Sequence, residues 1–100
     1  MNKLIRVADY IAKYCVDLGV RHVFMLTGGG AMHLNDGFGK HQQLGCIFHH
    51  HEQACAIAAE SYARGTGKLA VANITTGPGG LNTLTGVMGC WTDSVPVLFI

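Results

Sequence analysis

Apolar residues follow two different spacings along the chain, and the two spacings alternate. From Leu4 to Leu18 they recur every three or four residues, which predicts a helix with one apolar face that ends at Gly19. Short runs of branched and aromatic residues predict buried strands at His22–Leu26, Gly45–His49, Leu69–Ile74 and Val95–Ile100. Helical patterns between these runs cover Ala31–Phe38, Glu52 to Gly65–Gly67, and Leu81–Trp91, the last with Leu81, Leu84, Val87 and Met88 on one face.

This alternation predicts the fold class. Helices that alternate with nearly continuous apolar strands imply parallel strands joined by crossovers, with both faces of the sheet covered. We therefore expect an α/β fold with an open parallel sheet and helices on both faces. Ligands of such sheets bind beyond the carboxyl ends of the strands. The sequence places three loops at that edge: Thr27–Gly30, His49–Glu52 and Thr75–Gly80.

Composition narrows the function classes. One hundred residues, 49% of them hydrophobic, form one domain at most. The net charge is only +1 and the basic residues are scattered, so nucleic acid is not an expected partner. The uncharged stretch Leu69–Thr92 contains Pro78, Asn73 and several glycines, which argues against a membrane span. The four cysteines are too widely spaced for a CxxC motif and are expected to be small buried residues.

The two ends of the sequence allow further predictions about location and chain length. Near the start, Lys3, Arg6, Asp9 and Lys13 interrupt the apolar residues, so no signal peptide is predicted and a cytoplasmic location follows. The sequence stops inside the apolar run Val97–Ile100, which predicts that residues 1–100 are the front part of a larger protein. We expect the isolated chain to be poorly soluble or oligomeric.

Polar residues gather where the Glu52 helix begins. A first-turn glutamate stabilises a helix by roughly 0.3–1 kcal/mol through the helix dipole, which is one interpretation of Glu52. Its position at the same sheet edge as two glycine-rich loops favours a functional interpretation. Histidine is a common metal ligand, but at most His49 and His51 lie on one face of an extended segment, and no nearby Asp or Cys completes a set. We therefore expect the histidines to line a pocket mouth and predict no metal site.

The glycine loops leave two further alternatives. Gly28–Gly30 follows a strand, and Glu52 comes about twenty positions later, as in a dinucleotide-binding motif. However, the third glycine of that motif would fall at His33, which weakens an NAD(P)-binding interpretation. The Gly77–Gly80 turn can cradle a phosphate, although Pro78 removes one N–H donor. It can equally form a wall of backbone against a flat ligand.

The order of the motifs carries more information than any one of them. The chain contains Val23-Phe24 leading into a glycine loop, HEQ at His51–Gln53, AAESYARGTGK at Ala58–Lys68, TTGPGG at Thr75–Gly80 followed by Asn82, and DSVP at Asp93–Pro96. This series resembles the N-terminal, pyrimidine-binding domain of thiamine-diphosphate-dependent enzymes, and is closest to the acetolactate synthase group with its decarboxylase and carboligase relatives. The resemblance runs from about Leu4 to Ile100 and implies a thiamine-diphosphate-binding fold.

The resemblance implies roles for particular residues. Glu52 matches the family's glutamate, which hydrogen-bonds N1′ of the cofactor's aminopyrimidine and activates the cofactor for attack on a 2-keto acid. After loss of carbon dioxide, a proton or a second carbonyl compound takes up the product. By the same correspondence, the cofactor-binding residues are Leu26, Thr27 and Gly28 in the first loop and Thr76, Pro78 and Asn82 around the GPG loop. Thr75 stands where some decarboxylases carry a proton-transferring histidine, and it cannot play that role.

The proposed proton transfer sets an expectation for Glu52. Sharing a proton with a weakly basic ring nitrogen asks for a pKa above the reference value of about 4.3, and partial burial would raise it. The positive end of the helix dipole opposes this shift. We take a raised pKa as the hypothesis.

The resemblance also implies parts that this chain lacks. The family holds Mg²⁺ and the diphosphate on a C-terminal domain with a GDG motif, and the active site lies between two subunits, so a homodimer or homotetramer is implied. A small subunit of a split enzyme is a variant of this interpretation. A dinucleotide-binding domain and a non-catalytic domain kept for assembly are the competing alternatives. Which 2-keto acid reacts, and whether FAD is required, stay open.

Overall fold

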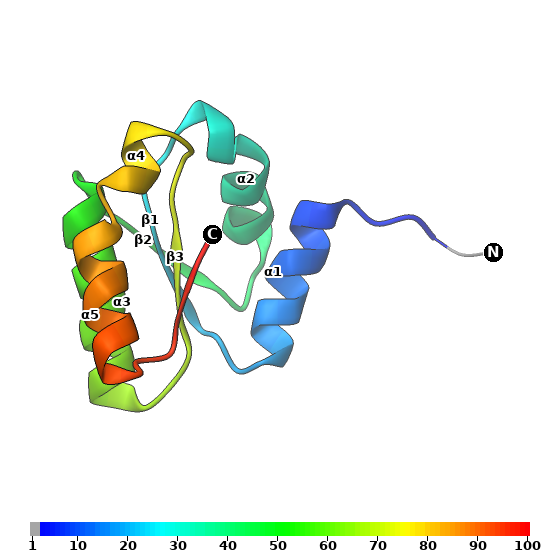
Figure 1. Cartoon of the computed structure of the whole chain (residues 1–100). Helices are drawn as coiled ribbons and strands as arrows, with labels where there is room; N and C mark the ends of the chain where they lie inside the picture. Colours follow the sequence, from blue (N-terminus) through cyan, green and yellow to red (C-terminus); the bar gives the residue numbers. More distant parts are fainter. Residues whose placement is uncertain (1–2) are drawn as a thin grey trace.

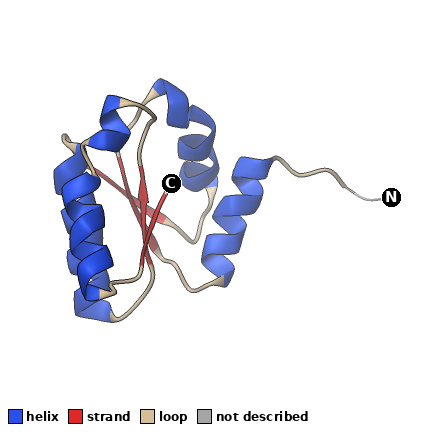
Figure 2. Ribbon diagram, viewed as in Figure 1, coloured by secondary structure: helices blue, strands red, loops and turns tan. Residues whose placement is uncertain are grey.

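A computed structural model describes residues 3–100 and contains one parallel sheet (Figure 2). The strands are β1 (His22–Met25), β2 (Gly45–Phe48), β3 (Ala70–Asn73) and β4 (Val97–Phe99), in the order β2-β1-β3-β4. All neighbouring strands are parallel. The predicted open α/β sheet is therefore confirmed.

Helices cover both faces of this sheet, as predicted. They are α1 (Val7–Asp17), the 3₁₀ turn η1 (Gly29–Ala31), α2 (Met32–Lys40), α3 (Glu52–Thr66), α4 (Pro78–Leu81) and α5 (Leu84–Asp93). Figure 1 shows α1 and α2 on one side of the sheet and α3 and α5 on the other. Strand residues alternate between the two sides: Val23 and Met25 pack with α1 and α2, whereas Phe24 packs with α3.

Besides shifts of one to three residues at the ends of several elements, two segments differ from the prediction. The segment Thr75–Gly80 is not loop throughout, because the helical turn α4 begins at Pro78, which is favoured in the first turn of a helix. The predicted helix Leu81–Trp91 is interrupted at Asn82–Thr83, and α5 begins only at Leu84.

The apolar residues predicted to share one face of the Leu81–Trp91 helix lie largely at the surface. Leu81, Leu84 and Met88 are 66%, 56% and 63% exposed, and Trp91 is 84% exposed. The buried face of α5 carries Gly86 and Cys90 instead, together with Thr83 just before the helix. A Cβ atom built on Gly86 would lie 2.5 Å from Cβ of Ala56 in α3. Small side chains thus let α5 approach α3 closely, and the large apolar side chains point outward.

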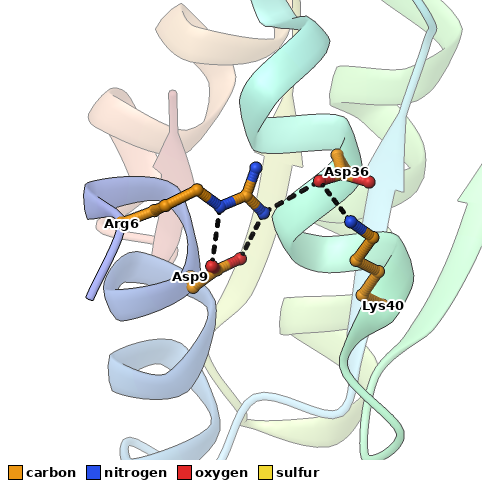
Figure 3. Close-up of polar contacts among 4 residues, drawn as sticks. All are labelled: Arg6, Asp9, Asp36 and Lys40. Carbon is orange, nitrogen blue, oxygen red and sulfur yellow. Dashed lines mark hydrogen bonds and ion pairs between the residues drawn. The ribbon is translucent and has the colours of Figure 1, made fainter. Parts of the chain in front are cut away.

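A network of ion pairs joins α1 to α2 (Figure 3). Nη2 of Arg6 lies 2.7 Å from Asp9 in α1 and 2.8 Å from Asp36 in α2, and Asp36 also pairs with Lys40 at 2.9 Å. Hydrogen bonds from Arg6 and Lys40 lower the pKa values of Asp9 and Asp36. The network links the start of α1 to α2, which follows directly on the first glycine loop.

The prediction of buried cysteines is confirmed for three of the four. All four are free thiols; Cys15, Cys55 and Cys90 are buried and Cys46 is partly buried. Burial raises the pKa of each thiol, and for Cys55 burial and the nearby Glu52 charge raise it to about 12. Among residues 3–100, no helix is long and apolar enough to cross a membrane.

Candidate active site at the carboxyl edge of the sheet

The register of the strands brings the three predicted loops together. Met25, the last residue of β1, is level with Phe48 at the end of β2 and with Asn73 at the end of β3. The segments that follow these residues therefore leave the sheet at the same edge. This confirms the predicted convergence of the loops beginning at Thr27, His49 and Thr75.

Glu52 is the first residue of α3 and faces the loop that follows β3. His51 is the N-cap of the helix, and its Nδ1 accepts a hydrogen bond from the backbone N–H of Gln53 at 3.0 Å. The Glu52 Oε2 atom accepts a hydrogen bond from Nδ2 of Asn82 at 3.1 Å. A Cβ built on Gly79 would lie 3.3 Å from the other carboxylate oxygen, Oε1. The carboxylate is thus held between Asn82 and a stretch of bare backbone.

The hypothesis of a raised Glu52 pKa is wrong for the chain in this state. The hydrogen bond from Asn82 lowers the pKa of Glu52, the backbone N–H of Glu52 itself lowers it further, and desolvation opposes both only in part. The helix start and its amide neighbour favour the charged form more strongly than burial disfavours it. Glu52 is therefore an anion near neutral pH.

The first loop is anchored on Thr75. The backbone N–H of Gly30 donates a hydrogen bond to Oγ1 of Thr75 at 3.2 Å. A Cβ built on Gly28 would lie 2.5 Å from Cβ of Thr75, and one built on Gly79 would lie 2.9 Å from its Cγ2. Thr75 therefore touches both glycine loops, and only residues without side chains fit at Gly28 and Gly79.

The other residues predicted for the site are Leu26, Thr27, Thr76 and Pro78. Leu26 is partly buried, and its side chain packs against the core that α3 covers. Thr27 and Thr76 are exposed at this edge, and Oγ1 of Thr76 would lie 2.8 Å from a Cβ built on Gly30. Pro78 is exposed in the first turn of α4.

The histidines do not form a metal centre. His49 packs against the Phe24 ring at a centroid distance of 6.0 Å, and its buried Nε2 has no hydrogen-bond partner within residues 3–100. His50 is exposed, and His51 caps α3. In this described part of the chain, no three His, Cys, Asp or Glu side chains gather in an arrangement that could hold a metal ion.

Two contacts and one buried residue at this edge were not predicted from the sequence. Gly79 approaches Glu52 closely, and Thr75 receives the first loop, but neither contact leaves a local signal in the sequence. Asn73 is fully buried at the end of β3 and donates a hydrogen bond to Asn35 of α2 at 2.6 Å. The sequence did contain a signal for Asn73, because this polar residue ends an otherwise apolar strand.

Comparison with known families decides the identity of the domain. A family described as "Thiamine pyrophosphate enzyme, N-terminal TPP binding domain" matches residues 5–100. The chain belongs to this family. Membership confirms the resemblance drawn from the motifs, and the dinucleotide-binding and assembly-only alternatives are not favoured.

The most similar relatives include several acetolactate synthases. The chain is 45% identical over 85 residues to acetolactate synthase from Arthrospira platensis, which covers 82% of this chain and 15% of the relative. It is 38% identical over 96 residues to the acetolactate synthase large subunit of Haemophilus influenzae, covering 93% and 16%. The corresponding protein of Lactococcus lactis subsp. lactis is 38% identical over 82 residues, covering 82% and 14%. The chain thus spans only about one seventh of the length of these relatives.

Proposed function

We propose that this domain serves a thiamine-diphosphate-dependent enzyme that decarboxylates a 2-keto acid and joins the product to a second carbonyl compound, as acetolactate synthases do. One observation carries the proposal. The carboxylate of Glu52 is held by Asn82 beside the bare backbone of Gly79, in a domain of the thiamine-pyrophosphate-binding family.

The residues at the sheet edge fit a flat, nitrogen-containing ring. Glu52 supplies a carboxylate that can accept or share a proton at N1′ of an aminopyrimidine. Gly28 and Gly79 present no side chains, so both glycine loops pack closely on Thr75, and the backbone of Gly79 comes close to the Glu52 carboxylate. The proposed cofactor-binding set is Leu26, through its backbone, with Thr27, Gly28, Glu52, Thr76, Pro78 and Asn82. Thiamine diphosphate, when bound, supplies the electron sink for decarboxylation.

The lowered pKa of Glu52 bears on how this residue would work. In the chain alone, Glu52 is ionised and bound to Asn82. A ligand and a second subunit that cover the carboxylate would remove water from it, and desolvation favours the protonated form. Glu52 would then share a proton with N1′ more evenly, because burial by the second subunit would raise the pKa of Glu52.

The proposal includes a second subunit, supported by an apolar stripe on α4 and α5. We define the α5 stripe as Leu81, Leu84, Met88 and Trp91, all more than half exposed. No residue from Leu69 to Thr92 is charged, so charge does not oppose burial of this face. Exposed apolar patches of this kind mark interaction sites. We propose that a second copy of the protein packs on the α5 stripe in a homodimer or homotetramer, and that Mg²⁺ is bound by residues outside this chain.

Light scattering of the full-length protein tests the second-subunit proposal. Leu84→Lys places a charge on the stripe and should shift the assembly toward monomer. Thr85→Lys is the matched control, because Thr85 is exposed on the same helix but outside the stripe, and it should leave the assembly intact. Equal effects of the two variants, or none from Leu84→Lys, would contradict the proposal.

An activity assay of the full-length protein tests the chemistry. With thiamine diphosphate, Mg²⁺ and pyruvate as probe, Glu52→Gln should lower the rate of carbon dioxide release by about 10²- to 10⁴-fold, the usual contribution of a positioned proton-transfer group. Glu60→Gln makes the same change later in α3 and should leave the rate within a few-fold. Release that survives in Glu52→Gln, or that needs no thiamine diphosphate, would contradict the proposed function.

A further inference from the structure

The hydroxyl group of Thr75 caps a helix start that has no cap of its own. The 3₁₀ turn η1 and the helix α2 follow Gly28, and neither has a side chain at its own N-cap position that accepts a hydrogen bond. The first N–H groups of a helix need such an acceptor. Oγ1 of Thr75, 45 positions away in the sequence, accepts a hydrogen bond from the N–H of Gly30 at 3.2 Å. The hydroxyl group therefore ties the first glycine loop to the segment that follows β3.

The methyl group of Thr75 faces the other glycine loop. A Cβ built on Gly79 would lie 2.9 Å from Cγ2 of Thr75 and 3.3 Å from Oε1 of Glu52. The methyl group and the carboxylate oxygen therefore lie on the same side of Gly79, around the space that a side chain would fill. Gly79 itself is buried. Removal of the methyl group would open a gap beside Gly79, into which its backbone can move.

Gly79 links this contact to the second neighbour of the Glu52 carboxylate. The carbonyl oxygen of Gly79 accepts a hydrogen bond from the backbone N–H of Asn82 at 3.2 Å, and Nδ2 of Asn82 donates to Oε2 of Glu52 at 3.1 Å. The same turn is braced by the buried Thr83, whose hydroxyl donates to the carbonyl of Gly80 at 2.6 Å. A shift of Gly79 therefore carries Asn82 with it and changes both contacts of the carboxylate.

We propose that Thr75 is a positioning residue with two separate tasks: its hydroxyl group anchors the first glycine loop, and its methyl group keeps Gly79 and Asn82 against Glu52. This inference rests on the proposed function, because the carboxylate held in this way is the group that would act on the cofactor. Threonine carries a hydroxyl and a methyl group on the same branched carbon. Serine keeps only the hydroxyl group and valine only methyl groups, so the two tasks can be removed one at a time.

Hydrogen exchange of the full-length protein without cofactor separates the two tasks. Thr75→Val removes the acceptor for Gly30 and should make peptides that cover η1 exchange about fivefold faster, which corresponds to about 1 kcal/mol, with little change in α4. Thr75→Ser should speed exchange in peptides that cover α4 and leave η1 protected. Thr66 is the matched control, because its hydroxyl also accepts a backbone N–H, from Lys68 at 3.2 Å, but at the opposite end of α3 from Glu52. A residue that only stabilises the fold would give two Thr75 variants that speed both segments alike, and this result would overturn the inference.

Proton exchange at C2 of bound thiamine diphosphate separates this inference from the proposed function. Thr75→Ser should slow exchange at least about tenfold, because misplacement of a reacting group by about 1 Å can cost 10²-fold. Thr75→Val should slow it clearly less, and Thr66→Ser should leave it unchanged. If exchange is fast in the wild-type protein but Thr75→Ser matches it, or Thr75→Val is slowed as strongly, the inference is wrong and the proposed function stands. If exchange in the wild-type protein is no faster than in free thiamine diphosphate, both are wrong.

Discussion

Replacing Gly86 by alanine should loosen the contact between α3 and α5. The new Cβ would lie 2.5 Å from Cβ of Ala56 and 3.2 Å from its carbonyl carbon, whereas carbon atoms in ordinary contact are about 3.5–4.0 Å apart. The overlap of about 1 Å involves backbone as well as side chain, so no rotamer change relieves it. Overpacking of this kind costs about 1–3 kcal/mol, and the better helix propensity of alanine offsets up to about 1 kcal/mol. A net loss of about 1 kcal/mol remains.

Hydrogen exchange of the full-length protein, read on peptides from α3 and α5, measures this loss. One kcal/mol corresponds to about fivefold faster exchange of the α5 amides. Gly39→Ala in α2 is the matched control, because a Cβ there meets nothing within 4 Å, and it should slow exchange in α2 by up to about fivefold. If Gly86→Ala also slows exchange, the close approach of α3 and α5 does not require a glycine at this position.

Three further predictions concern charges and caps. Asp36→Asn removes one of the two partners of Arg6 and the partner of Lys40. Because the pKa of Asp36 is lowered in the folded chain, the resulting loss in urea midpoint should be full above the unfolded value of about 3.9 and disappear as the pH falls through the lower folded pKa; a loss of equal size at every pH would contradict it. Asn82→Ala removes the main cause of the lowered Glu52 pKa, so NMR titration should find that pKa raised, and an unchanged or lower value would refute the assignment. His51→Ala removes the acceptor for the N–H of Gln53 and should cost about 1 kcal/mol in urea unfolding, with recovery in His51→Asp and no recovery if the cap is unimportant.

The sheet and its functional edge were predictable because their signals are local. Each buried strand is a short apolar run, and a parallel sheet places every following loop at one edge. The contact between Glu52 and the segment ending at Asn82 follows from that rule, although the residues are thirty positions apart. Close approaches such as those at Gly79 and Gly86 depend on the path of two chain segments in space, so the sequence alone does not show them.

One gap and one error in the sequence-based predictions have physical causes. Helical periodicity places Leu81, Leu84 and Met88 on one face of the helix but does not say whether that face is buried, and the face packed against α3 carries the smaller Gly86 and Cys90. The pKa of Glu52 depends on a balance between burial and hydrogen bonds. The hydrogen bond from Asn82 lowers the pKa of Glu52, whereas the sequence led us to expect a raised value.

Proton exchange at C2 of thiamine diphosphate bound to the full-length protein tests the central role of Glu52 most directly. The cofactor and Mg²⁺ are added without substrate, and exchange into deuterated water is followed by NMR for the wild-type protein and Glu52→Gln. Exchange that is fast in the wild-type protein and at least about 10²-fold slower in Glu52→Gln is the predicted result. Bound cofactor that exchanges at the same rate in both proteins would contradict the account, because Glu52 would then only begin a helix.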